Sequence, residues 1–155
     1  MAAVRRATTA DAGDLGRLLY EFNSEFSEPT PDAELLAERI AMFIEHDHAT
    51  FLLAGGGPDG FAELRYRPTV YSEGLDAYLE ELYVVPGKRG AGLGRALLEA
   101  AMTIARERGA TRMDLGTSED DTAARSLYES AGFTNREGKP DGPQMLYYER
   151  ELTEV

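Results

Sequence analysis

Residues 78–109 read YLEELYVVPGKRGAGLGRALLEAAMTIARERG, and this stretch decides the fold. An apolar segment typical of a strand is followed by a glycine-rich turn and then by the pattern of a long amphipathic helix. Glycines in the turn bring backbone amides within reach of a ligand. The first N–H groups of a helix beginning near Gly92 lack partners within the helix and carry about half a positive charge. The sequence therefore predicts an anion site, suited to a phosphate or pyrophosphate.

Two common phosphate-binding loops do not match this turn. A P-loop requires Gly-Lys followed by Ser or Thr, whereas Lys88 is followed by Arg89. The dinucleotide-binding fingerprint requires G-x-G-x-x-G, whereas the glycines at 90, 92 and 94 read G-x-G-x-G. The pattern that does match is R-x-x-G-x-G directly after the apolar segment LYVVP.

This loop resembles the pyrophosphate loop of the GNAT superfamily of N-acetyltransferases, which bind acetyl-CoA. A second stretch resembles the superfamily's N-x-x-A-x-x-L-Y-x-x-x-G-F pattern, and its matching residues are Asp121, Ala124, Leu127, Tyr128, Gly132 and Phe133. The two motifs lie about one strand and one helix apart, so the chain is identified as a member of the superfamily. Asp121 departs from the usual Asn and loses its amide donor, although an acid can still cap a helix beginning at Thr122.

The resemblance implies a single domain over residues 1–155 of the α/β (α+β) class, with a twisted mixed sheet of six or seven strands flanked by four helices. Strand patterns fall at 3–8, 50–54, 61–66, 77–85, 112–116, 133–136 and 145–151. Thr9 or Asp11 is expected to cap the first helix, and the prolines of residues 28–31 are expected to stop it. The other helices are expected to end near His46 and to span about 92–108 and 122–131.

The composition argues against several kinds of site and several classes of protein. The chain has no cysteine, which excludes disulfides, thiolate zinc sites and an acyl-cysteine intermediate. A net charge of −12 disfavours general binding to nucleic acids. No apolar run reaches the ~18 residues of a membrane span and no signal peptide is visible, so a soluble cytoplasmic protein is expected. His46 and His48 would point apart on a helix and have no further ligands nearby, so no metal is expected.

The resemblance implies that acetyl-CoA is the acetyl donor and assigns residues to hold it. The turn residues expected to bind the pyrophosphate through their backbone are Gly90, Ala91, Gly92, Leu93, Gly94 and Arg95, with Arg89 adding charge. The main chain of Leu82, Tyr83 and Val84 is expected to pair with the pantetheine arm, and the Val84 N–H to bind the oxyanion. Asp121 and Ala124 are the expected contacts from the second motif.

Three side chains are candidates for the chemistry. The resemblance makes Tyr128 the general acid that protonates the departing thiolate, the alternative being that it only packs its helix onto the sheet. Glu80 and Glu81 interrupt an apolar strand, and neighbours on a strand point to opposite faces, so at most one should face the acetyl group. Similarity to diamine acetyltransferases, whose strand reads L-E-D, favours Glu80 as the base, acting through water. Glu81 is the next candidate, and a surface glutamate without a chemical part is the third interpretation.

These features predict an N-acetyltransferase that transfers acetyl directly to an amine in a ternary complex. Ten acids oppose two arginines between residues 11 and 48, a local charge of −8 that either solvates a helical face or attracts a small cationic amine. A peptide amine stays open as acceptor. The segments 28–31 and 68–74 are expected to line the acceptor site. The alternatives are an inactive acyl-CoA-binding or partner-binding module and an unrelated nucleotide-binding domain. The apolar segment LYYEREL would suit a homodimer.

Overall fold

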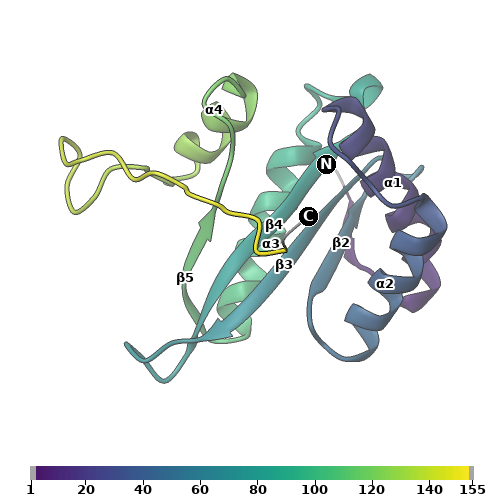
Figure 1. Ribbon diagram of the computed structural model, residues 1–155, viewed down its shortest axis with the longest axis horizontal. Helices are drawn as coiled ribbons and strands as arrows, with labels where there is room; N and C mark the ends of the chain where they lie inside the picture. Colours follow the sequence, from purple (N-terminus) through teal and green to yellow (C-terminus); the bar gives the residue numbers. More distant parts are fainter. Residues whose placement is uncertain (1–2, 154–155) are drawn as a thin grey trace. The chain divides into compact units, whose positions relative to one another are not determined.

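The computed structural model describes residues 3–153, which cluster into two compact units divided after Leu115. Figure 1 labels the α-helices and the strands β2 to β5. The first unit contains β1 (Val4–Arg6), η1 (Thr9–Asp11), α1 (Ala12–Glu25), α2 (Ala33–Glu45), β2 (Thr50–Ala54), β3 (Gly60–Pro68), β4 (Leu75–Val84), η2 (Pro86–Lys88), α3 (Leu93–Glu107) and β5 (Ala110–Leu115). The second unit contains α4 (Thr122–Ser130).

The sheet is mixed, as predicted, with the strand order β1-β2-β3-β4-β5. The first four strands pair antiparallel, and β5 pairs parallel to β4 after the crossover through α3. The α/β class and the four α-helices are confirmed. Within residues 3–153 the sheet has five strands, fewer than the six or seven expected.

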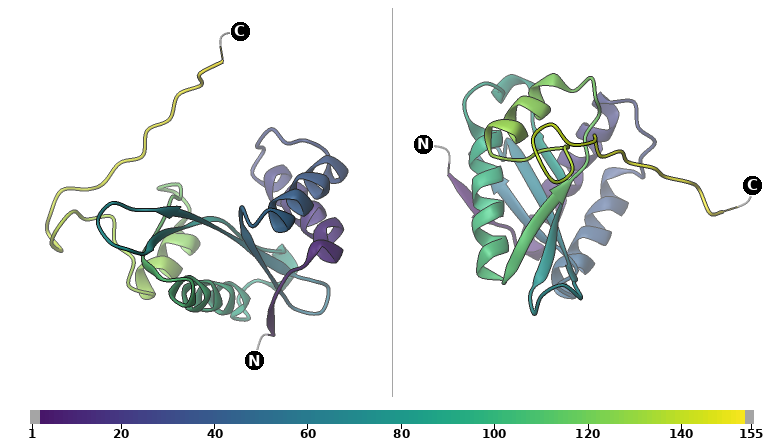
Figure 2. Two further views of the ribbon diagram at one scale, coloured as in Figure 1. Left: turned by 90° about the horizontal axis from the view of Figure 1, so that it is seen from below. Right: turned by 90° about the vertical axis from the view of Figure 1, so that its left-hand side faces the viewer.

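The helices cover both faces of the sheet, with α1 and α2 on one face and α3 on the other (Figure 2). The core on the first face joins apolar residues of α1, α2 and the central strands, among them Leu15, Leu18, Ile40, Phe51, Leu53, Phe61 and Tyr83. Gly16 lets α1 approach α2 closely, because a Cβ there would lie 2.5 Å from the Ala33 carbonyl oxygen. The α3 helix buries its own stripe of Leu93, Leu97, Leu98, Ala101 and Ala105.

Asp11 is the N-cap residue of α1, which confirms one of the two caps predicted, and the 3-10 turn η1 comes directly before the helix. The Asp11 carboxylate accepts the Thr8 N–H at 2.8 Å and an Arg5 guanidinium hydrogen at 2.7 Å. The Arg5 hydrogen bond, followed by that from Thr8, lowers the pKa of Asp11 to about 2. None of the helices within residues 3–153 has the length and apolar character needed to span a membrane.

The two strands predicted at 133–136 and 145–151 do not form in the part of the chain that the structure describes. One bridge joins Arg136 to Gln144, and the Met145 N–H donates to the Asn135 carbonyl oxygen at 2.7 Å. Tyr147 and Tyr148 are 75% and 84% exposed. Alternation of apolar residues is only half of a strand signal, since a strand also needs a neighbour along its whole length. These contacts join the two segments only where they face each other across the turn, so within residues 3–153 neither extends into a ladder.

In the second unit, α4 is capped as predicted. The Asp121 carboxylate accepts the Ala124 N–H at 3.1 Å, so the acid serves as N-cap despite replacing the usual Asn. Gly132 follows the C-cap residue Ala131 with a left-handed φ of 95°, and the Phe133 N–H closes the turn on the Tyr128 carbonyl oxygen at 3.0 Å.

Candidate active site

On the side of β4 that faces β5, strand pairing ends at Leu79. That residue pairs with Leu115 at the end of β5, whereas β4 continues to Val84 while still paired with β3. The Val85 N–H donates to the Asp59 carbonyl oxygen on the β3 side at 2.8 Å. Because inward and outward backbone groups alternate in an antiparallel pair, those of Leu82 and Val84 point to the opposite side, where β5 has ended.

The glycine-rich turn after β4 is open. Gly90 and Gly92 adopt left-handed φ angles of 83° and 89°, which favour glycine, and a Cβ added at either position would meet no atom within 4 Å. Gly92 is the N-cap of α3 and receives no side-chain cap. The first backbone N–H groups of α3 therefore stand at an exposed turn that no side chain fills.

Arg89 lies on the side of the turn that faces α1. Its guanidinium donates to the Val84 carbonyl oxygen at 2.9 Å and to Glu25 Oε1 at 2.8 Å, and it lies 5.6 Å from the centre of the Tyr83 ring. The Tyr83 hydroxyl donates to the same Glu25 oxygen at 3.2 Å, and Phe22 stacks on Tyr83 at 4.8 Å. The hydrogen bond from Arg89 lowers the pKa of Glu25. The predicted phosphate-side cation is thus tied to the end of α1.

A β-bulge brings both candidate bases to one face of the sheet. Leu82 lies opposite Ala62 and Leu79 opposite Leu64, so the two residues between them, Glu80 and Glu81, oppose the single β3 residue Glu63. The bulge corrects the expectation that neighbouring side chains must point to opposite faces. Glu63 is flanked along β3 by Phe61, a member of the core under α1 and α2, so the three carboxyl groups lie on that helix-covered face.

Burial and the charges of neighbouring carboxylates raise the pKa of two members of this cluster, Glu63 and Glu81. Burial, followed by the charges of Glu80 and Glu81, raises the pKa of Glu63 to about 8. Burial, followed by the charge of Glu80, raises the pKa of Glu81 to about 7. A carboxyl group with a pKa near neutrality is suited to accepting a proton from a substrate. The bulge lies one step beyond the Leu79–Leu115 pair, so the cluster and the freed backbone of β4 adjoin.

Comparison with known proteins identifies the family. The model of the acetyltransferase (GNAT) family matches residues 15–133. The chain belongs to this family. A crystal structure of a candidate acetyltransferase from Arthrobacter sp. FB24 superposes with a TM-score of 0.88 at 45% identity, covering 97% of this chain and 96% of that one.

Two curated relatives connect the family to named reactions. Aminoglycoside N(6')-acetyltransferase type 1 of Klebsiella aerogenes is 39% identical over 110 residues, which cover 66% of this chain and 67% of the relative. Mycothiol acetyltransferase of Beutenbergia cavernae is 45% identical over 62 residues, or 38% of this chain, and the match spans about a fifth of that protein, 21%. Both relatives are named as acetyltransferases, in agreement with the family assignment.

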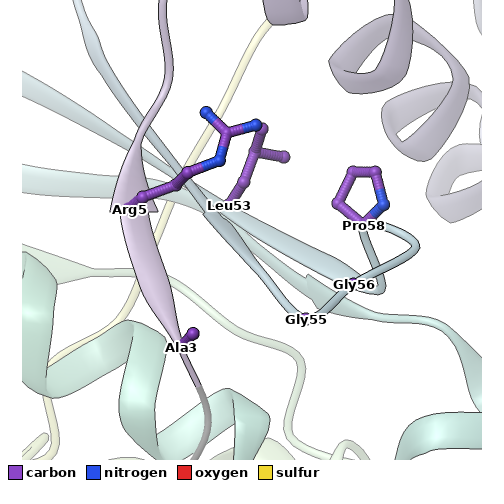
Figure 3. A pocket seen from close by; sticks show the side chains of 6 residues that line it. All are labelled: Ala3, Arg5, Leu53, Gly55, Gly56 and Pro58. Atoms are coloured by element: carbon purple, nitrogen blue, oxygen red, sulfur yellow. The ribbon is translucent and has the colours of Figure 1, made fainter.

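A cavity lies at the hairpin between β2 and β3 in the first unit (Figure 3). This cavity of about 290 Å³ is lined by Ala3, Arg5, Leu53, Gly55, Gly56 and Pro58. Its one ionisable side chain, Arg5, is already paired with Asp11. Because the lining offers no nucleophile, acid or base, we do not assign the chemistry to it.

Tyr128 lies in the second unit, half-buried on α4, with its ring edge-on to Phe133 at 6.1 Å. This contact lies within α4 and the turn at its C-terminal end, and packing of the helix onto the sheet stays a prediction. Its role as general acid stays a prediction, as do the cofactor contacts of Asp121 and Ala124.

The two loops expected to line the acceptor site lie in different parts of the first unit. Segment 28–31 comes after the end of α1, where Glu25 contacts Arg89 beside the glycine turn. Segment 68–74 joins β3 to the start of β4 at Leu75, whereas the glycine turn lies beyond the end of β4 at Val84. Its tip residues Val70 and Tyr71 are 94% and 95% exposed. Of the two loops, segment 28–31 is therefore the better candidate.

Sequence reasoning missed Glu63. The signal was available, because FAELRY places one carboxylate inside an apolar strand pattern, and a buried carboxylate without a partner is costly. What the sequence did not supply was the register that sets Glu63 opposite Glu81.

Proposed function

We propose that this acetyltransferase moves an acetyl group from acetyl-CoA to the primary amine of a small cationic molecule, by direct attack in a ternary complex. The observation that carries the proposal is the continuity of two features. The outward backbone of Leu82 and Val84 has no strand partner on the β5 side, and it leads directly into an open glycine turn at the start of α3.

The backbone suits the two ends of the donor. In this proposal the N–H groups of residues 90–95 bind the diphosphate, as free amides at a helix start do for anions. The backbone of residues 82–84 pairs with the pantetheine amides in the manner of an added strand, which leaves the Val84 N–H to stabilise the oxyanion. Acetyl-CoA supplies a thioester, whose sulfur is a better leaving group than an alkoxide or an amide nitrogen.

The proton transfers fall to side chains. Glu80 or Glu81 takes a proton from the acceptor ammonium, whose nitrogen then forms a bond to the acetyl carbon. The bond from that carbon to sulfur breaks, and the thiolate receives a proton from Tyr128. The nitrogen then gives up its second proton, which restores Tyr128 through water and leaves a neutral amide. The raised pKa of Glu81 supports the first step, since a base with a pKa near 7 is about half ionised at neutral pH and still holds a proton well. The sequence motif supports the second step.

Two observations support the proposed class of acceptor, namely the negative charge of the protein and one relative. The chain carries a net charge of −12, and three glutamates gather at the bulge. Both features favour a cationic acceptor over an acidic or neutral one. The aminoglycoside acetyltransferase relative makes small polyamino compounds the first class to screen, with peptide amines second.

The test is release of free CoA. Purified protein, acetyl-CoA and a panel of aminoglycosides, aliphatic polyamines and short basic peptides are mixed with a thiol reagent, and neutral polyols serve as controls. We expect thiol release that depends on at least one amine. Stabilisation by CoA without thiol release from any amine would contradict the proposal and support a binding module. Stabilisation by ATP or NAD but not by CoA would contradict the donor assignment.

A further inference from the structure

Glu63 is an anomaly in the first unit. Its side chain lies in the middle of β3, and the residue is 6% exposed. Its direct partner on β2 is Phe51, an apolar residue that is 1% exposed. Within residues 3–153, none of the ion pairs or side-chain hydrogen bonds involves Glu63. A carboxyl group so placed costs free energy unless it keeps its proton or acquires a partner.

The charges that act on Glu63 come from β3 and β4. Glu80 and Glu81 oppose it across the bulge and resist a further negative charge. Arg65, two residues along β3, acts in the opposite sense but contributes less than either glutamate. Its guanidinium lies over the Phe43 ring of α2, 4.9 Å from the ring centre. The protein itself therefore leaves the three-carboxyl cluster short of positive charge.

We propose that Glu63 is a positioning residue for the acceptor: its buried carboxyl group keeps a proton while the site is empty and releases it to solvent when an ammonium group reaches Glu80 and Glu81. The O–H bond of Glu63 breaks, its proton goes to water, and the carboxylate left behind is balanced by the positive nitrogen. That nitrogen afterwards gives its own proton to Glu80 or Glu81. The acceptor thus replaces a proton as the counter-charge of the buried acid.

This inference rests on the proposed function, because it assigns the acceptor ammonium to the β-bulge. The inference explains why a third acid, Glu63, lies opposite the two candidate bases. A single ionised base next to an ammonium is enough for proton transfer, whereas a second negative charge that appears only on binding helps to retain the cation. The expected signature is therefore in acceptor binding more than in the chemical step.

The direct test is a carbon-13 NMR titration of protein labelled at glutamate carboxyl carbons, with Glu63→Gln identifying the signal. We expect the Glu63 carboxyl to titrate well above the free-glutamate range, and Glu80→Gln or Glu81→Gln to lower its midpoint. With CoA present, butane-1,4-diamine should lower the midpoint by about one pH unit or more, and butane-1,4-diol should not. Titration in the ordinary range, or equal midpoints with diamine and diol, would overturn the proposal.

Kinetics provide a second readout if the wild type turns over. Glu63→Gln should raise the KM for the amine about tenfold and leave kcat within about twofold, since it removes a charge without removing the base. Glu63→Asp should recover part of the lost affinity. The matched control is Glu99→Gln, at an exposed position of α3. An unchanged KM in Glu63→Gln would reduce Glu63 to a packing residue. If the wild type turns over no amine, the proposed function fails and the NMR titration alone decides the role of Glu63.

Discussion

The first unit has two glycine-rich turns, and they differ in whether other atoms fill the space around their glycines. At residues 55–60 the turn closes on itself: the Asp59 N–H donates to the Ala54 carbonyl oxygen at 2.8 Å, and a Cβ on Gly55 would collide with the Asp59 carboxylate. At residues 89–94, Gly90 and Gly92 face open space. The first turn is a hairpin connection, and the second is an exposed backbone surface.

Each turn has an arginine beside it, so positive charge does not distinguish the two turns. Arg5 beside the hairpin pairs with Asp11 at 2.7 Å, and Arg89 beside the second turn pairs with Glu25 at 2.8 Å. The difference lies in the element that each turn leads into. The hairpin leads into β3, whose backbone groups are used by the sheet, whereas the second turn begins the helix Leu93–Glu107 with its first amides unpaired within the helix. Glycine content alone therefore does not indicate an anion site.

The largest expected effect comes from filling the open turn. Gly92→Val should weaken CoA binding by about 100-fold or more, since losing two hydrogen bonds to a charged group costs about 3 kcal/mol. Valine is also strained at the left-handed φ of Gly92. Isothermal titration calorimetry measures the change. Gly56→Ala is the matched control in the hairpin, where a Cβ meets nothing within 4 Å, and it should leave CoA binding unchanged. Equal effects of the two variants would remove the distinction between the turns.

The next largest effect is expected in kcat, and it distinguishes a residue that acts in the chemical step from one that binds CoA. Tyr128→Phe should lower kcat at least tenfold, because a general acid contributes about 10²- to 10⁴-fold, and it should leave CoA affinity unchanged. Steady-state kinetics and calorimetry on the same preparation measure both quantities. Unchanged kcat would exclude Tyr128 as the acid, and a parallel loss of CoA affinity would indicate that the tyrosine holds the cofactor instead.

The pH dependence of kcat tests which glutamate is the base. With a pKa of about 7, Glu81 is mostly protonated at pH 6 and mostly ionised at pH 8, so kcat should rise about tenfold over that range. Glu81→Gln should abolish this rise. Glu80→Gln should move it to lower pH, because the charge of Glu80 raises the pKa of Glu81. If Glu80→Gln abolishes the rise and Glu81→Gln only moves it, then Glu80 is the base.

The smallest expected effect concerns Arg89. Glu25→Gln removes the charge that holds the guanidinium beside α1, so Arg89 should become more available to the diphosphate. CoA affinity should rise about two- to fivefold at low salt, the range of a partly exposed ion pair. Glu21→Gln on the same helix is the control. A loss of affinity in Glu25→Gln would mean that the Glu25–Arg89 pair shapes the turn for binding.

Much of the first unit could be predicted from sequence, because its signals are local. The glycine turn, the helix after it and the five strands of the sheet follow from patterns within a few residues, although β5 begins at Ala110, two residues early. The capping role of Asp121 followed in the same way. The family motifs are also short, and they identified the acetyltransferase.

The features that escaped prediction depend on partners distant in sequence. The Arg89–Glu25 pair joins residues 64 positions apart, and the bulge at Glu80 exists only relative to β3. Burial of Glu63 follows from which face of the sheet the helices cover, which no local pattern fixes. For the same reason, the pattern in residues 145–151 predicted a strand, whereas in the structure the segment bonds residues 133–136 at its first residue, Met145, and forms no ladder.

Hydrogen–deuterium exchange with and without acetyl-CoA tests the central claim most directly, because it reads backbone amides in both glycine turns at once. We predict that acetyl-CoA protects the amides of residues 90–95 and of Leu82 and Val84, leaves those of residues 55–60 unchanged, and that ATP at the same concentration protects neither turn. Protection confined to the hairpin, or unchanged exchange at residues 90–95 under saturating acetyl-CoA, would contradict the account.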